Sequence, residues 1–98
     1  VVLSIGINSK NMEPDWWVAP NPFSNGLTVF IPMQYEGLIE YRLYGFSGKR
    51  VASGTGFSQY GKMGLPGAME LLPGMYLLEL RTEDHVLRKK IIKSHELR

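Results

Sequence analysis

Apolar residues alternate with polar ones at every second position in several short stretches of this chain, and no stretch shows the spacing of an amphipathic helix. The pattern is clearest in residues 38–44, where Ile39, Tyr41 and Leu43 are separated by two charged residues. Alternation of this kind turns one side of an extended chain toward a core and the other toward solvent. The sequence therefore predicts a protein built from β-strands.

The same alternation predicts five more strands, at residues 2–7, 27–31, 49–53, 75–82 and 85–93. In the fourth of these, Tyr76, Leu78 and Leu80 are expected in the core, and Glu79 is expected in solvent. The pair Glu83-Asp84 is short enough to be the hairpin turn between the last two strands.

Three segments depart from the simple pattern. Two apolar pairs in residues 85–93 predict either a β-bulge near residues 88–90 or apolar contacts on both faces. Residues 54–67 hold five glycines and predict a long connection with little regular structure. Residues 67–72 have helical propensity but are too few for a stable helix, so we expect a strand or a turn.

Together the strands predict an all-β fold, a single antiparallel immunoglobulin-like β-sandwich of about seven short strands.

The length of the chain, 98 residues, allows one such sandwich and no second core. A hydrophobic content of 44% can supply that core without disulfides, and the sequence has no cysteine. A net charge of +2 is too small to indicate a nucleic-acid partner. No apolar run is long enough to span a membrane as a helix.

The sequence APNPF at residues 19–23 marks a boundary, because each proline fixes its own backbone and extends the residue before it. We expect a stiff, extended segment there. The polar residues 8–15 before it are expected to form a linker, and the strand-like start of the chain suggests a piece of a larger protein. We therefore divide the chain into residues 1–15, the end of an upstream region, and residues 16–98, a folded domain.

Patterns typical of enzymes are incomplete in this sequence. Residues 56–63 spell G-x-x-x-x-G-K followed by Met63. A phosphate-binding loop needs Ser or Thr in place of this methionine, and the loop must lie between a strand and a helix. The sequence meets neither condition. His85 and His95 have no partners at metal-ligand spacing, and no serine lies in a G-x-S-x-G context. We therefore expect no enzyme activity, no metal and no cofactor.

Trp16 and Trp17 suggest a different function, since exposed aromatic rings on a β-sandwich can stack on sugars. Adjacent residues of a strand face opposite sides, which favours one tryptophan in the core and the other half exposed. A carbohydrate-binding or adhesive module that uses Trp16, Trp17 and Tyr35 is the alternative function.

The last predicted strand gathers the basic residues: six of the eleven lie in residues 81–98. We expect its lysines at the surface, where they either bind an anionic partner or protect a sheet edge from aggregation. The apolar residues of the same strand also allow a dimer to form through that edge.

Four segments, taken in order, resemble the C-terminal sorting domain, type A, of cargo proteins of the type IX (Por) secretion system. They are APNPF at 19–23, LYGFSGKRV at 43–51, LLPGMYLLEL at 71–80 and KKIIK at 89–93. The resemblance covers about residues 17–93, and Ala19 stands where the family has an aromatic residue. The residues that would carry the sorting signal are Pro20, Asn21, Pro22, Phe23, Gly48, Lys49, Gly74, Tyr76, Lys89, Lys90, Ile91, Ile92 and Lys93.

The resemblance implies a non-enzymatic address domain that takes an upstream cargo domain, joined in cis, across the outer membrane. Its implied partners are the type IX translocon, an outer-membrane shuttle protein and a sortase-like protease that cuts in the linker, residues 8–15. The domain would be in the periplasm in transit, and then at the cell surface or outside the cell.

Four of the signal residues have physical roles that suit this family. Gly48 and Gly74 provide the permissive backbone that tight turns need. Phe23 is expected to be the first core anchor of the sandwich. Tyr76 is expected to place its ring in the core, with a hydroxyl that can cap a backbone group.

Overall fold

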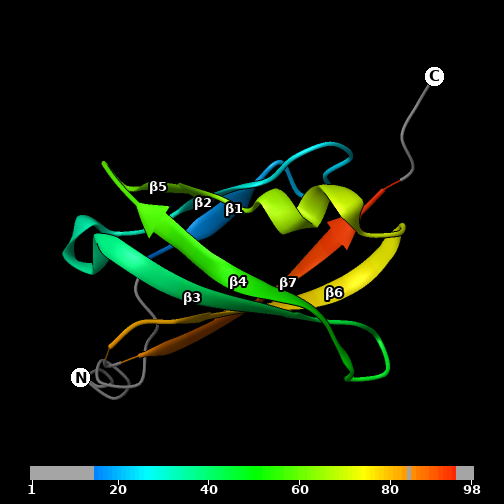
Figure 1. Ribbon diagram of the computed structural model, residues 1–98. Helices are drawn as coiled ribbons and strands as arrows, with labels where there is room; N and C mark the ends of the chain where they lie inside the picture. The colour runs from blue at the N-terminus through cyan, green and yellow to red at the C-terminus, as the bar shows by residue number, and fades with distance from the viewer. Residues whose placement is uncertain (1–14, 84, 95–98) are drawn as a thin grey trace, which may run out of the picture.

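Two packed antiparallel sheets make up the protein in a computed structural model that describes residues 15–83 and 85–94 (Figure 1). Within these residues the strands are β1 (Trp17–Ala19), β2 (Thr28–Phe30), β3 (Gly37–Tyr44), β4 (Arg50–Ser58), β5 (Lys62–Gly64), β6 (Gly74–Arg81) and β7 (Val86–Lys93). One sheet has the order β1-β2-β5 and the other the order β4-β3-β6-β7. Two short 3-10 helices, η2 (Met33–Tyr35) and η3 (Pro66–Glu70), lie between strands. The predicted all-β antiparallel sandwich is confirmed.

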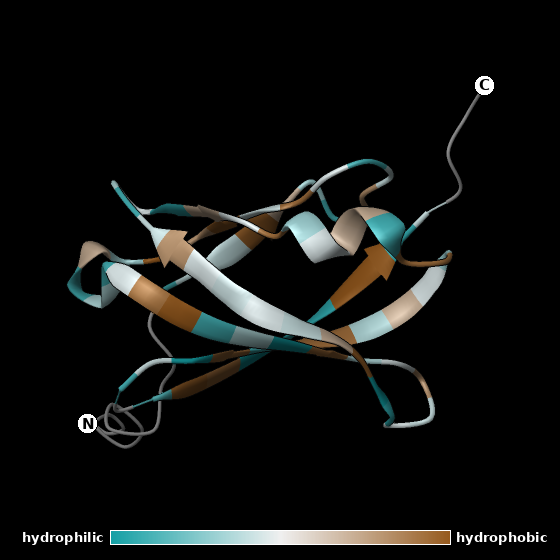
Figure 2. Cartoon of the chain, viewed as in Figure 1, coloured by the Kyte–Doolittle hydropathy of each residue, from teal (hydrophilic) through white to brown (hydrophobic). Residues whose placement is uncertain are grey.

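The core lies between the two sheets and includes the inward residues that alternation predicts. Figure 2 shows apolar residues recurring between polar ones along β3. The inward residues of the predicted strands are buried as expected: Leu27, Val29, Ile31, Ile39, Tyr41, Leu43, Leu78 and Leu80. Period-two alternation therefore identified eight of the sixteen apolar side chains that are buried in the described residues.

The glycine-rich segment is not the irregular connection that the sequence predicts. Its first half belongs to β4, which pairs with β3 from Arg50 to Ser58, and its second half contains β5 in the other sheet. A tight turn joins the two, with positive φ at Tyr60 (56°) and Gly61 (78°), as a type I′ hairpin turn requires. The segment is thus the strand pair that passes from one sheet to the other.

The glycines of β4 are there for space rather than flexibility, which explains why the prediction was wrong. A Cβ built at Gly54 would lie 2.9 Å from the Tyr41 hydroxyl oxygen, and one at Gly56 would lie 2.6 Å from the Met63 sulfur. Small residues on the inner face of β4 therefore let two large core side chains pass beneath it.

Residues 67–72, predicted as a strand or a turn, contribute instead to the 3-10 helix η3. The amides of Ala68 and Leu71 donate to the carbonyls of Leu65 (3.0 Å) and Ala68 (3.3 Å). Pro66 occupies the first turn, where a missing amide hydrogen costs nothing, and Ala68 is fully buried. One buried side chain and one proline are enough to fix this short helix against the sandwich.

β7 pairs with β6 in unbroken register, so the predicted bulge near residues 88–90 is wrong. The other prediction, apolar residues on both faces, is confirmed. Leu87 and Ile91 face the core, whereas Val86 and Ile92 lie partly exposed on the outer face of the sheet. The strand begins at Val86, one residue later than predicted.

The turn between β6 and β7 lies where it is predicted. The Thr82 amide donates to the His85 carbonyl (2.9 Å), and the His85 amide donates to the Thr82 hydroxyl (3.0 Å). The predicted strand at residues 2–7, nearly all of the linker, Asp84 and the tail after Ser94 lie outside the described residues. The domain boundary after residue 15 therefore stays a prediction.

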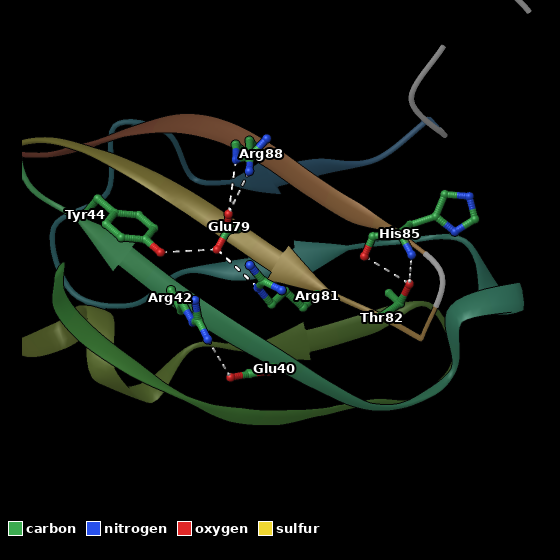
Figure 3. A network of polar contacts seen from close by, with 8 residues as sticks. All are labelled: Glu40, Arg42, Tyr44, Glu79, Arg81, Thr82, His85 and Arg88. Atoms are coloured by element: carbon green, nitrogen blue, oxygen red, sulfur yellow. Dashed lines mark hydrogen bonds and ion pairs between the residues drawn. The ribbon is translucent and has the colours of Figure 1, made fainter. Parts of the chain in front are cut away.

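Glu79 is buried, although the sequence predicts it in solvent. It points to the outer face of the sheet, where Arg88 Nε (3.1 Å) and the Tyr44 hydroxyl (3.3 Å) donate to its carboxylate and Arg81 Nε lies 3.5 Å away (Figure 3). Burial acts to raise the pKa of Glu79, but the charges of Arg81 and Arg88 and the hydrogen bonds outweigh it, so the pKa lies below its ordinary value. The charged carboxylate ties three neighbouring strands together.

Gly74→Val is expected to destabilise the domain by about 1–3 kcal/mol, because a residue with a side chain is strained at such a backbone angle. Gly74, the first residue of β6, has a φ of +153°. The matched control is Gly64→Val in β5, where a Cβ would meet no heavy atom within 4 Å. Thermal unfolding of both variants measures the difference, and equal melting temperatures would contradict the assignment of strain to Gly74.

Candidate functional site

The sequence motifs that lie far apart in the chain meet at one end of the four-stranded sheet. Gly74 at the start of β6 is opposite Lys93 at the end of β7. Tyr44, the last residue of β3, is opposite Leu77, so the turn at residues 45–49 also projects from this end. All three features lie toward the right in Figure 1. The motifs therefore form one region of the molecule.

Asn21 joins the first motif to the last one. Its side-chain oxygen accepts a hydrogen bond from the Ile92 amide (3.0 Å), and its side-chain nitrogen donates to the Lys90 carbonyl (3.4 Å). The side chain thus takes the place of a neighbouring strand at the edge of β7. The segment is bent at residues 20–22, with cis peptide bonds before both prolines, so the predicted extended run is wrong.

Phe23 continues this pairing with its backbone. Its amide donates to the Ile92 carbonyl (2.9 Å), and its carbonyl accepts from the Ser94 amide (2.8 Å), which makes a short parallel bridge to β7. Its ring is fully buried, so the prediction of a core anchor is confirmed. These bonds cover the last part of the β7 edge. The predicted dimer through that edge is untested and stays a prediction.

Lys93 is buried, although the sequence predicts its charge at the surface. Its ammonium donates to the carbonyls of Met69 (3.1 Å) and Leu71 (2.9 Å) and lies 5.6 Å from the centroid of the Phe23 ring. Lysine is rarely buried unless its charge finds partners, and here two carbonyls and a ring provide them. The side chain fastens η3 and the first motif to the end of β7.

Lys89 and Lys90 lie on opposite faces of the same strand. Lys89 is half-buried on the inner face, with its ammonium 4.8 Å from the centroid of the Trp16 ring. Lys90 is exposed on the outer face, opposite Leu77. The three lysines of the last motif therefore have three different environments.

The comparison with known protein families decides the assignment. A family model described as secretion system C-terminal sorting domain matches residues 17–94. The chain belongs to this family. It is the C-terminal sorting domain of a type IX secretion cargo protein. No curated protein matches the chain.

The match covers all seven strands of the sorting domain that the structure describes. It begins at the first residue of β1 and ends at Ser94, whose amide and hydroxyl both donate to the Phe23 carbonyl. The end of the matched range thus lies beside the first motif.

The remaining residues that the sequence predicts to carry the signal lie at or near turns of the sorting domain. Gly48 has a φ of +88°, and its amide donates to the Gly45 carbonyl (2.9 Å), which closes the turn that carries the exposed Lys49. The Tyr76 hydroxyl donates to the Leu72 carbonyl, as the predicted backbone cap requires, and its ring packs half-buried against the core.

The residues of the alternative, sugar-binding function do not form one site on the sorting domain. Trp16 is 3% exposed and Trp17 is 52% exposed, which confirms one tryptophan in the core and the other half exposed. Burial excludes Trp16 as a platform for a sugar ring. Trp17 stacks on Phe30 with the ring centroids 5.3 Å apart, and Tyr35 packs edge-on against His85. Trp17 and Tyr35 line different surface hollows.

Two kinds of functional element are missing from the part of the chain that the structure describes. Its histidine and acidic side chains form no group of three that could hold a metal ion. None of its helices is long and apolar enough to cross a membrane.

Sequence reasoning did not find the hydrogen bonds of Asn21, yet the sequence contains a hint of them. Asn21 stands between two prolines, which have no amide hydrogen to donate to a strand edge. A side-chain amide carries both a donor and an acceptor and can replace the missing backbone groups.

Proposed function

We propose that the type IX secretion machinery recognises the folded domain at the end of the four-stranded sheet where the four motifs meet. The observation that supports this proposal is the hydrogen bonding of Asn21 and Phe23 to β7. Because of these bonds, residues that are separate in the sequence share one surface whose shape depends on the fold. In this proposal the motif residues act together, and each has either a structural or a contact role.

The partners that we propose are the translocon, the outer-membrane shuttle protein and a sortase-like protease. The domain would fold in the periplasm, guide its upstream cargo through the outer membrane, and then be cut off within residues 8–15. The cargo would remain at the cell surface or outside the cell. The domain has no catalytic role in this scheme, because it is the substrate of the protease.

A reporter fusion tests this function directly. We expect that a periplasmic reporter carrying all 98 residues at its C-terminus leaves the cell in a host with the type IX system. The measurement is reporter activity in the medium and on intact cells. In a control host without the translocon, the same fusion should stay in the periplasm. An intact fusion that stays in the periplasm of the competent host would overturn the proposal.

A further inference from the structure

The outer face of the four-stranded sheet has an apolar groove beside the four motifs. Its walls are Gly45, Phe46, Met75, Tyr76, Leu77 and Lys90. The groove has a volume of about 260 Å³. This is below the roughly 300–1,000 Å³ of typical small-molecule sites, so a protein side chain is the better occupant.

The apolar walls of the groove are exposed to solvent. Phe46 is 90% exposed at the tip of the β3–β4 turn, and Met75 and Leu77 are 43% and 38% exposed on β6. Ile92, opposite Met75 on β7, extends the same apolar surface. Contiguous exposed apolar surface on a small domain is typical of an interaction site.

Lys90 provides the charge at the groove. The two other lysines of its motif are engaged inside the domain, Lys93 with two carbonyls and Lys89 with the Trp16 ring. Within the described residues, no carboxylate lies at ion-pair distance from the Lys90 ammonium. Of the three lysines, Lys90 is therefore the one available to a partner.

The charged residues in the middle of the same face form ion pairs with one another. Arg42 pairs with Glu40, and Arg81 and Arg88 pair with Glu79 (Figure 3). Anionic membrane surfaces are bound by clusters of about 4–8 available Lys or Arg residues, which this face does not offer. A second copy of the domain would bring another Lys90 toward the groove, and like charges oppose such a contact.

We infer that a component of the secretion machinery docks here by placing an apolar side chain in the groove and a neighbouring carboxylate on Lys90. This inference rests on the proposed function and names the contact through which it works. Burial of the apolar side chain would supply the affinity, and the ion pair with Lys90 would supply orientation and selectivity. Asn21, Phe23 and Lys93 hold the groove in shape and do not touch the partner.

The test uses the reporter fusion with Phe46→Ser and Lys90→Glu, each measured against a matched control. The controls are Phe57→Ser, an exposed phenylalanine at the other end of the same face, and Lys62→Glu, an exposed lysine on the other sheet. We expect export to fall by about tenfold or more in both groove variants. Both controls should be exported like the wild type, and all four should melt like the wild type. If Phe46→Ser melts lower, Met75→Gln takes its place.

The outcomes separate the two proposals. If the wild-type fusion itself stays in the periplasm, the proposed function is overturned. If the wild type leaves the cell and both groove variants leave as fast as their controls, the groove is not the docking site. Equal export of Lys90→Gln and Lys90→Glu would exclude an acidic neighbour on the partner.

The two alternative occupants of the groove, a second copy of the domain and an anionic lipid surface, are tested on the purified chain. In sedimentation we expect no dimer that depends on Phe46, and we expect no binding to vesicles that contain half phosphatidylglycerol. A dimer that Phe46→Ser abolishes would assign the groove to a second copy. Vesicle binding that Phe46→Ser and Lys90→Glu abolish would assign it to a lipid surface. Either result would overturn the inference of a protein partner.

Discussion

Phe23→Ala is expected to destabilise the sorting domain by about 3–5 kcal/mol, the usual cost of removing a fully buried phenylalanine ring. For a domain of this size, the melting temperature should then fall by more than about 12 °C. The ring is completely buried, and the ammonium of Lys93 lies above it. Its loss opens a cavity where the first and last motifs meet, so export of a fused reporter should fall as well.

Thermal and denaturant unfolding measure this loss of stability. Phe46→Ala is the matched control, because the same ring is removed from a position that is 90% exposed. The control should keep the stability of the wild type. Similar melting temperatures for the two alanine variants would show that Phe23 does not anchor the core.

Lys93→Gln is expected to lower the stability by about 2–4 kcal/mol, since each hydrogen bond from a charged group contributes about 1.5–3 kcal/mol and removal of the buried charge offsets part of the loss. The shorter side chain cannot reach both the Met69 and Leu71 carbonyls, and η3 loses its attachment to β7. Lys90→Gln removes an exposed charge and should change the stability by no more than about 0.5 kcal/mol.

Unfolding and export measured on both lysine variants separate folding from recognition. We expect Lys93→Gln to lose export in proportion to its loss of folding, and Lys90→Gln to fold normally but to be exported less. The opposite ranking of the melting temperatures would contradict the positions of the two lysines. Replacing all the lysines of this motif at once would mix the two effects.

Most of the fold could be predicted because its strands alternate cleanly. In β3, Ile39, Tyr41 and Leu43 alternate with charged residues, so the face of the sheet that each side chain occupies follows directly from the sequence. The failure at β4 has a physical cause. Gly54 and Gly56 lower the strand propensity of the sequence. They leave space for the side chains of Tyr41 and Met63, and this packing exists only in the folded protein.

The candidate site could be predicted only as a set of residues. The resemblance to a family named them, but not the contact between Asn21 and β7, because no local pattern encodes a bond between the two ends of a domain. The burial of Lys93 could nevertheless have been predicted from the sequence. Residues 87, 89, 91 and 93 share one face of a strand, so a core position for Leu87 and Ile91 places Lys93 beside them. The two apolar pairs of this strand, Val86-Leu87 and Ile91-Ile92, obscured this alternation in the sequence.

The hydrogen bond between Asn21 and Ile92 spans 71 positions, so this pairing of the first and last motifs requires both ends of the domain to be present. The segment around Asn21 has no partner at that edge until β7 has joined the fold. A domain that is truncated before Ile92 cannot close this pairing. The entropic cost of closing a loop rises only slowly with loop length, so the long separation of the two residues adds little to the cost of this pairing. The surface that the first and last motifs share therefore forms only when β7 has joined the sheet, and a domain without the end of β7 would lack it.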